Sequence, residues 1–277
     1  MKPVATYQKL RGGYYTPKPI ADFLAQWAIQ SPTTEILEPS CGDGVILASA
    51  VETLIEHGAD ESVLTQHLVH GVELDAHEAL GAADRIRSLN VPINPVQVHV
   101  GDFFAYCKER LAKGHFFDAV IGNPPFIRYQ NFLEEHRIAA FYLMQQAGLH
   151  PNRLTNAWVP FLVASTLLLN KHGRMAMVIP AELLQVDYAA ELRYFLSNNY
   201  SKITLITFKK LVFEGIQQEV VLLLGERNGN ENTGIRTIEL DDIDDLASYE
   251  HTDFCSDDLK PMDHSTEKWT RYFLEKQ

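Results

Sequence analysis

The chain has 277 residues, of which 46% are hydrophobic and 22% are charged. This length allows one substantial α/β core but not two full domains of ordinary size, and the composition excludes a disordered or fibrous protein. The formal net charge of −12 argues against a simple nucleic-acid-binding module, which is usually basic.

The acidic residues are concentrated late in the chain. Residues 231–264 contain eleven acidic and two basic side chains, so the remainder is nearly neutral. A run of this kind is typical of a solvated segment. We therefore expect an acidic linker after the part of the chain that carries the chemistry.

The three cysteines, Cys41, Cys107 and Cys255, are far apart. They form no CxxC pair, and no Cys/His group has the spacing of metal ligands, so we expect reduced thiols and no metal site. No run approaches the roughly 18 apolar residues that span a bilayer, and residues 1–10 lack the apolar core of a signal peptide. The sequence therefore predicts a cytoplasmic protein without membrane contact.

Along the chain, apolar runs of strand length alternate with stretches of helical period, which is the pattern of a parallel sheet. The predicted strands are Glu35–Glu38, Leu68–Leu74, Val96–Val100, Phe117–Ile121, Met175–Ile179, Ile203–Phe208 and Glu219–Leu224. The predicted helices are 45–57, Ala76–Leu89, Asn156–Asn170 and Ala189–Leu196. We expect a Rossmann-like α/β fold over residues 1–228, with a seven-stranded, mostly parallel doubly wound sheet whose last two strands pair as a C-terminal β-hairpin.

In a doubly wound sheet, ligands bind outside the carboxyl ends of the strands. Polar or turn-forming residues follow five of the predicted strands, at 38–44, 73–75, 102–104, 123–126 and 180–182. These clusters should meet at one edge of the sheet and form a binding site.

The first cluster contains Gly42 and Gly44, where the backbone bends tightly and lets a ligand approach. Such a turn is equally compatible with a nucleotide phosphate or with plain helix packing. Two later carboxylates favour an adenosine pocket: Glu73 is placed to accept hydrogen bonds from ribose hydroxyls, and Asp102 from an adenine amino group, with Phe103 as an apolar wall. The chain lacks a Gly-Lys-Ser/Thr turn for a nucleoside triphosphate.

The most specific string is Gly122–Phe126, with the sequence Gly-Asn-Pro-Pro-Phe. An amino group conjugated to an aromatic ring is a poor nucleophile, so activation requires fixed acceptors for both of its protons. The Asn123 side-chain oxygen and the Pro124 carbonyl can supply them, Pro125 stiffens the turn, and Phe126 offers a face for stacking. Positioning and preorganised dipoles then carry the rate without a strong general base.

At this point the sequence resembles the gamma class of amino-methylating DNA methyltransferases, whose catalytic motif is Asn-Pro-Pro-Tyr/Phe. The resemblance covers roughly residues 10–225, with the motifs in the family's order. The segments that carry it are Gly13–Pro17, Leu37–Gly44, Gly71–Asp75, Gly101–Phe104, Asn123–Phe126, Phe161 and Val212–Ile216.

The resemblance implies S-adenosyl-L-methionine as cofactor and adenine N6 in DNA as the methylated group, within a restriction-modification system. The implied cofactor-binding residues are Tyr14, Thr16, Pro17, Glu38, Ser40, Cys41, Gly42, Glu73, Leu74, Asp102, Phe103, Asn123, Pro125 and Phe161. The implied catalytic residues are Asn123, Pro124, Pro125 and Phe126, and a flipped base is expected to stack between Phe126 and Phe213.

Members of this class normally carry a C-terminal target-recognition domain. We expect residues 229–277 to be an acidic linker or the start of such a region, and DNA recognition to depend on a separate domain or subunit. Methylation of protein glutamine or ribosomal-RNA guanine remains an alternative, because those enzymes also use Asn-Pro-Pro-Tyr/Phe. Cytosine N4 methylation and a non-catalytic DNA-specificity subunit are further alternatives.

Overall fold

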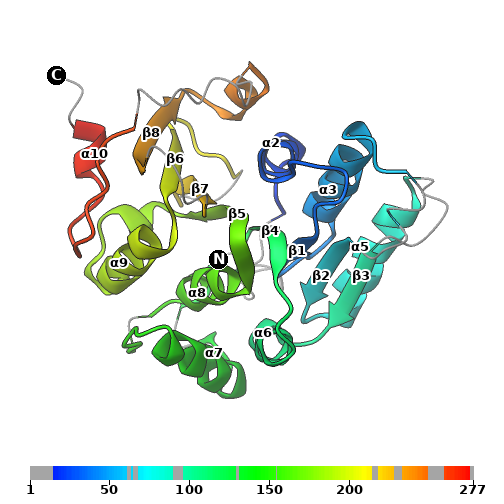
Figure 1. Ribbon diagram of the computed structural model, residues 1–277, viewed down its shortest axis with the longest axis horizontal. Coiled ribbons are helices and arrows are strands. Elements are labelled where there is room, and N and C mark those ends of the chain that lie inside the picture. Colours follow the sequence, from blue (N-terminus) through cyan, green and yellow to red (C-terminus); the bar gives the residue numbers. More distant parts are fainter. Residues whose placement is uncertain are drawn as a thin grey trace, which may run out of the picture.

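The computed structural model describes residues 15–60, 64, 68–89, 96–128, 131–153, 155–213, 218–227, 233–248 and 259–274. In these residues it contains an eight-stranded sheet with the order β3-β2-β1-β4-β5-β7-β6-β8 (Figure 1). The strands are β1 (Ile36–Glu38), β2 (Val69–Glu73), β3 (Val96–Val100), β4 (Phe117–Gly122), β5 (Leu169–Pro180), β6 (Lys202–Phe208), β7 (Val220–Glu226) and β8 (Gly234–Leu240).

Every strand except β7 runs in the same direction. β1 pairs in parallel with β2 and β4, and β7 pairs antiparallel with both β5 and β6. The chain order turns back at β1, where β2 and β3 lie on one side and β4 on the other. Such a reversal is the place where open α/β sheets bind ligands.

Helices cover both faces of the sheet, which confirms the doubly wound prediction. One apolar cluster joins the sheet to α2 (Lys18–Ala28), α3 (Val45–Glu56) and α5 (Ala76–Arg87). A second cluster on the other face joins it to α6 (Phe103–Ala112), α7 (Glu134–Gln146), α8 (Trp158–Leu168) and α9 (Ala190–Asn199). Strands buried on both faces read as continuous apolar runs, as β7 does.

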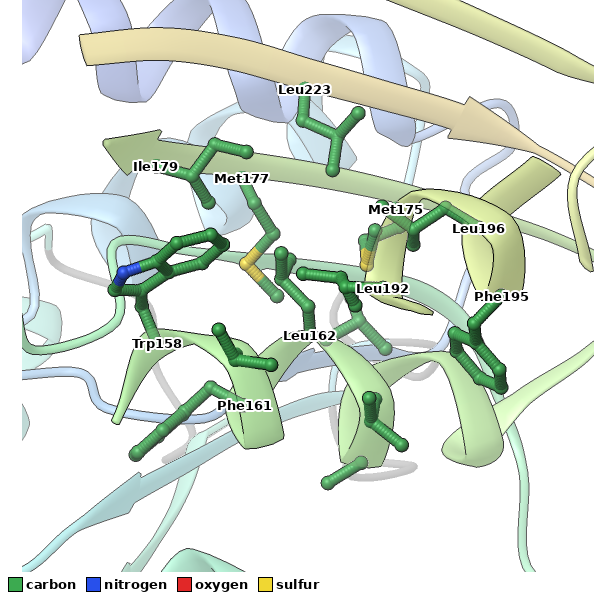
Figure 2. Packing of buried hydrophobic residues seen from close by; sticks show 14 of the residues in the cluster. Trp158, Phe161, Leu162, Met175, Met177, Ile179, Leu192, Phe195, Leu196 and Leu223 are labelled. Carbon is green, nitrogen blue, oxygen red and sulfur yellow. The ribbon is translucent and has the colours of Figure 1, made fainter. Parts of the chain in front are cut away.

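The second cluster is centred on α8, which is buried along almost its whole length. Figure 2 shows Trp158 and Leu162 of α8 beside Met177 of β5, with Leu192 and Leu196 of α9 closing the same layer. An all-round apolar helix of this kind belongs in an interior. No helix in the described ranges is both long enough and apolar enough to cross a membrane.

Two sequence predictions about the elements are wrong. The sheet has eight strands instead of seven, because β8 pairs in parallel with β6 at the edge. The predicted helix Asn156–Asn170 is also too long, since α8 ends at Leu168 and β5 already begins at Leu169, where the chain pairs with Phe117 of β4. The predicted pairing of the last two strands is confirmed by β6 and β7.

The fold also continues past the expected boundary at residue 228. Besides β8, the described part of the acidic region includes Trp269, which is 1% exposed and whose backbone N–H donates to the Leu184 carbonyl. The guanidinium of Arg193, also 1% exposed, donates to the carbonyls of Thr266 and Glu267. These contacts make the described C-terminal residues part of the packed domain rather than a solvated linker.

Candidate functional site

A cavity of about 440 Å³ opens at the carboxyl ends of β1, β2, β3 and β4. Its volume lies within the range of small-molecule sites. It is lined by Tyr15, Pro39, Ser40, Gly42, Glu73, Leu74, Glu78, Gly101, Asp102, Phe103, Phe104, Asn123, Pro125, Ile127, Asn131, Phe132, Leu133, His136, Ala157 and Phe161.

The β1–α3 loop is held in place by the residues around it. The Gly42 backbone N–H donates to Glu73 Oε2 at 2.9 Å, and the Asp75 N–H donates to Glu73 Oε1 at the same distance. A carboxylate offers about four acceptor positions, so Glu73 can tie these two turns together and still accept hydrogen bonds from a ligand. Arg85 braces the far side of the loop by an ion pair with Asp43 at 2.5 Å.

The two glycines of this loop serve different needs. Both have positive φ, +48° at Gly42 and +78° at Gly44, a region that side chains other than glycine rarely adopt. A Cβ on Gly44 would lie 2.8 Å from Ala82 of α5, whereas a Cβ on Gly42 would meet nothing within 4 Å. Gly44 therefore allows α3 and α5 to pack closely, and Gly42 leaves room at the cavity wall.

Glu38 and Cys41 lie beneath the loop rather than on the cavity wall. Glu38 is 2% exposed, and its Oε2 atom has no hydrogen-bond partner among the described residues. Burial, together with the nearby Asp43 and Glu73, raises the pKa of the Glu38 carboxyl well above its usual value. Burial also raises the pKa of the Cys41 thiol, so Cys41 behaves as a small apolar residue.

The opposite wall combines a carboxylate with stacked aromatic rings. Asp102 caps α6 by accepting from the Ala105 N–H at 2.9 Å, and its other oxygen lies 3.8 Å from His136 Nδ1. Burial raises the pKa of Asp102, although the backbone donors and His136 act in the opposite direction. The rings of Phe103 and Phe161 stack with centroids 5.1 Å apart.

The Asn-Pro-Pro-Phe turn follows β4 and is tied to two other segments. The Asn123 amide nitrogen donates to Thr16 Oγ1 at 3.2 Å, and the Ser40 hydroxyl donates to the Asn123 backbone carbonyl at 3.3 Å. Because Thr16 takes the nitrogen side of the amide, the amide oxygen lies on the other side. The segment before α2, the β1–α3 loop and the β4 turn are thus joined at one point.

The structure brings most of the predicted site residues together, and nine of them line the cavity: Ser40, Gly42, Glu73, Leu74, Asp102, Phe103, Asn123, Pro125 and Phe161. Thr16 and Pro17 lie at the start of α2, and Thr16 reaches the site through Asn123. Tyr14 lies outside the described residues.

The two predicted stacking residues lie off the cavity wall. Phe213 is 6% exposed and belongs to the apolar cluster on the α2 face, against which the partly buried Phe126 also packs. Pro124 is buried next to Phe126. Neither Phe126 nor Phe213 is among the residues that line the cavity.

Sequence reasoning missed one side of the cavity. Asn131, Phe132, Leu133 and His136 contribute to it from the start of α7 and the turn before it. They follow no strand and form no motif, so nothing in the local pattern marks them. Tyr15 belongs to the Gly13–Pro17 motif but was not among the expected cofactor-binding residues; its hydroxyl contacts Glu78 at 3.3 Å.

A family model described as N-6 DNA Methylase matches residues 1–272 of this chain. The chain belongs to the N-6 DNA methylase family. A curated relative, a type II methyltransferase named M.BstVI from Geobacillus stearothermophilus, is 24% identical over 96% of this chain and 51% of its own length.

Solved structures show the same fold. The structure of a DrdV–DNA complex aligns with a TM-score of 0.70 at 16% identity and covers 91% of this chain and 30% of that chain. A putative class I S-adenosylmethionine-dependent methyltransferase from Listeria monocytogenes aligns with a TM-score of 0.62 at 16% identity, and the alignment covers 86% of this chain and 68% of that chain. The fold is therefore that of class I methyltransferases.

The chain is short for its relatives. It spans 51%, 45% and 44% of the lengths of three curated type II methyltransferases that it matches.

Proposed function

We propose that this chain transfers a methyl group from S-adenosyl-L-methionine to the N6 amino group of adenine in DNA, as the catalytic part of a restriction-modification methyltransferase. The observation that carries the proposal is the position of Asn123. Its side chain lies at the wall of a cavity at the carboxyl edge of the sheet, with the amide nitrogen held by Thr16.

The cavity suits the proposed cofactor in shape and in charge. Gly42 leaves space for a close approach, Glu73 and Asp102 present carboxylate acceptors at successive strand ends, and Phe103 and Phe161 form an apolar wall. These features match the ribose and adenine of the cofactor. The bound cofactor would supply an electrophilic methyl group on a sulfonium, and the acidic surroundings favour such a cation.

The protein's own part in the reaction is to hold the amino group. The Asn123 amide oxygen and the Pro124 carbonyl would accept the two amino protons, so that the nitrogen lone pair points at the methyl group. This arrangement lowers the barrier through fixed dipoles and orientation. This role of Asn123 and Pro124 is the one implied by the resemblance of the Asn123–Phe126 motif to the gamma class.

The target adenine must leave the DNA stack to reach this site, which costs a few kcal/mol. Stacking on Phe126 and Phe213, at about 1–3 kcal/mol per ring, would offset that cost. Because Phe213 is packed into an apolar cluster, its part in the sandwich requires the segment around it to move outward when DNA binds.

DNA affinity would come mainly from outside this catalytic part. Lys209 and Lys210 follow β6 close to Phe213, but each forms an ion pair with an aspartate of the acidic region, Asp241 and Asp242. Cations neutralised in this way contribute little to phosphate binding. A separate target-recognition domain or subunit fits this arrangement and the greater length of the relatives.

The test is to incubate the protein with labelled S-adenosylmethionine and, separately, with DNA lacking N6-methyladenine, transfer RNA, ribosomal RNA and a peptide-release-factor preparation. Label in DNA that digests to N6-methyl-2′-deoxyadenosine supports the proposal. Label recovered as N4-methylcytosine, or transferred to RNA or protein, would support one of the alternative amino groups instead.

Two variants separate the roles within the site. Asn123→Ala should abolish transfer and leave cofactor affinity nearly unchanged, whereas Glu73→Ala should weaken the cofactor by calorimetric titration. An active Asn123→Ala protein would refute the assigned catalytic role. Unchanged cofactor affinity in Glu73→Ala would refute the ribose contact.

A further inference from the structure

A second group of chemically active side chains lies at the opposite edge of the sheet from the cavity. Glu35 directly precedes β1, His70 lies at the start of β2, and His115 precedes β4. Because these three strands are parallel, their amino ends meet at one edge. The cofactor-site residues follow the carboxyl ends of the same strands, so the two groups are separated by the length of the strands.

The three side chains converge on one carboxylate oxygen. His70 Nε2 lies 2.9 Å and His115 Nε2 lies 2.8 Å from Glu35 Oε1. One potential ligand atom from each residue lies within 4.8 Å of the other two. Two imidazoles and a carboxylate that meet at a point are a typical ligand set for zinc and its neighbours among the divalent transition metals.

His70 is the residue that most needs an additional partner. It is 4% exposed, and neither of its ring nitrogens has a hydrogen-bond partner among the described residues. Its Nε2 atom lies 2.9 Å from Glu35 Oε1 without forming a hydrogen bond with it. A buried polar group without a partner costs about 1–3 kcal/mol, and a metal ion that accepts the Nε2 lone pair removes that cost.

The ligand positions are fixed by the backbone before any ion binds. The Glu35 carbonyl accepts from the N–H groups of both Asp118 and Ala119, and the Glu35 N–H donates to the Asp118 side chain. The His115 N–H donates to the Arg110 carbonyl, and His70 is held in register with Leu37 of β1. Ligands on such rigid supports bind a metal with little loss of conformational entropy.

The surroundings leave room for a fourth ligand. The ring of Phe117 contacts both histidines, with centroid distances of 5.3 Å to His70 and 4.9 Å to His115. On another side, His70 borders a cavity of about 190 Å³ that is also lined by Val98, His99, Tyr106 and Arg110. Such a space holds several water molecules.

We propose that Glu35, His70 and His115 form a binding site for a divalent transition-metal ion, most suitably zinc, with water completing the coordination. Ligands on bonds of about 2.0–2.1 Å stand roughly 3.3 Å apart in a tetrahedral site, so small side-chain rotations from the present contacts admit the ion. The ion cross-links the starts of β1, β2 and β4. Its role is structural, away from the methyl-transfer site.

The two histidines also affect the Glu35 carboxylate. Burial acts to raise the pKa of Glu35, but the contacts with His70 and His115 outweigh it and hold that pKa below the usual value. A metal ligand must be deprotonated, and the lowered pKa of Glu35 favours the ionised carboxylate.

The experiment uses the untagged full chain after dialysis against a chelator, titrated with Co²⁺ as a spectroscopic substitute for zinc and then displaced by Zn²⁺. We expect one equivalent to bind with the intense visible absorption of tetrahedral Co²⁺. Glu35→Gln and His115→Ala, both at partly exposed positions, should each lower the affinity at least about tenfold. Zn²⁺ should raise the melting temperature of the wild type more than that of either variant.

The matched control is His150→Ala. His150 also lies beside a glutamate, with its Nδ1 atom 3.1 Å from Glu191 Oε1, but this pair is exposed and is not part of the three-residue group. This variant should bind the metal like the wild type. The proposal is overturned if the wild type binds no stoichiometric Co²⁺, if a thiolate charge-transfer band places the metal on cysteine, or if Glu35→Gln and His115→Ala bind as tightly as the control. None of these results bears on methyl transfer, which is measured separately.

Discussion

The glycines of the β1–α3 loop allow packing and ligand approach to be tested separately. In Gly44→Ala, the new Cβ lies 2.8 Å from both the Cα and Cβ atoms of Ala82 and 3.3 Å from its carbonyl oxygen. Backbone atoms of a packed helix cannot rotate away, so α5 must shift. The left-handed φ of +78° adds a further cost of about 1 kcal/mol.

The expected magnitude follows from these two terms. Overpacking costs typically 1–3 kcal/mol, so the sum for Gly44→Ala is about 2–4 kcal/mol. At roughly 2–4 °C per kcal/mol for a domain of this size, the melting temperature should fall by about 4–16 °C. Gly42→Ala meets no neighbour within 4 Å, so only the backbone term of about 1 kcal/mol applies.

For cofactor affinity the order of the two variants should be reversed, with Gly42→Ala affected more than Gly44→Ala. Gly42 lines the cavity, and one added methyl group at a tight contact lowers affinity by about tenfold or more. Thermal unfolding followed by circular dichroism measures the stability, and calorimetric titration with S-adenosylmethionine measures the affinity. We expect Gly44→Ala to lose more stability than Gly42→Ala. We expect Gly42→Ala to lose more cofactor affinity than Gly44→Ala.

Gly58→Ala is the control for both measurements. Gly58 follows α3, has a φ of +90° and leaves a Cβ free of contacts within 4 Å. It therefore carries the backbone cost at a place outside the cavity lining. If Gly44→Ala melts no lower than Gly58→Ala, the crowding argument fails. If Gly42→Ala binds the cofactor as well as Gly58→Ala does, the close approach at this glycine is refuted.

Three further outcomes are expected. Thr16→Val removes the acceptor of the Asn123 amide and should slow transfer about fivefold, the effect of about 1 kcal/mol. The control Thr53→Val removes a hydroxyl that is bonded within α3 and should leave the single-turnover rate unchanged. Equal losses of rate in the two variants would contradict a positioning role for Thr16. Because the pKa of Glu38 is raised in the folded state, the folded protein keeps a proton that the unfolded chain releases, and wild-type stability should fall as pH rises from the unfolded pKa towards the folded one. Glu38→Gln should flatten this pH dependence of stability in denaturant titrations. The same pH dependence in wild type and variant would refute the role of Glu38. Arg193→Met leaves four backbone carbonyls without their donor, so it should destabilise the domain by roughly 3–5 kcal/mol. Limited proteolysis of this variant should then begin in the C-terminal region. A cleavage pattern like that of the wild type would contradict this prediction.

The strand ends that line the cavity were predictable because parallel strands place successive turns at one edge. Glu73, Asp102 and Asn123 each lie at the carboxyl end of a strand, and all three line the cavity. The hydrogen bonds by which these residues hold the surrounding loops were not predictable in the same way. The bonds from Glu73 to two backbone N–H groups depend on how the neighbouring loop folds back, which no local pattern specifies.

The C-terminal region was misread because charge was weighed above periodicity. The strand Gly234–Leu240 is mostly buried, with Ile235, Ile238 and Leu240 in the interior and only Glu239 exposed, so its apolar residues signal a strand despite the acidic residues around them. Further along the chain, Thr266 and Glu267 are held by the buried Arg193, which donates to their backbone carbonyls from over seventy positions away. Contacts at that separation leave no trace in a linear reading.

The same limit explains why no metal site was expected. Glu35, His70 and His115 are dozens of residues apart in the sequence, so the spacing of potential ligands gives no signal. They meet only because β1 pairs with β2 on one side and β4 on the other. Sequence spacing finds metal sites built on one hairpin or helix, and it cannot find sites assembled by sheet topology.

The three-residue strand β1 shows how topology gives similar side chains opposite properties. Glu35 precedes the strand and faces two imidazoles, which hold its pKa below the usual value, whereas Glu38 ends the strand under the glycine loop, where burial and two acidic neighbours raise its pKa. The contribution of Glu35 to stability is therefore present above its unfolded pKa and lost as pH falls through the folded value, while that of Glu38 is unfavourable and grows as pH rises. One strand thus joins a carboxyl with a lowered pKa at one sheet edge to a carboxyl with a raised pKa beneath the glycine loop at the other.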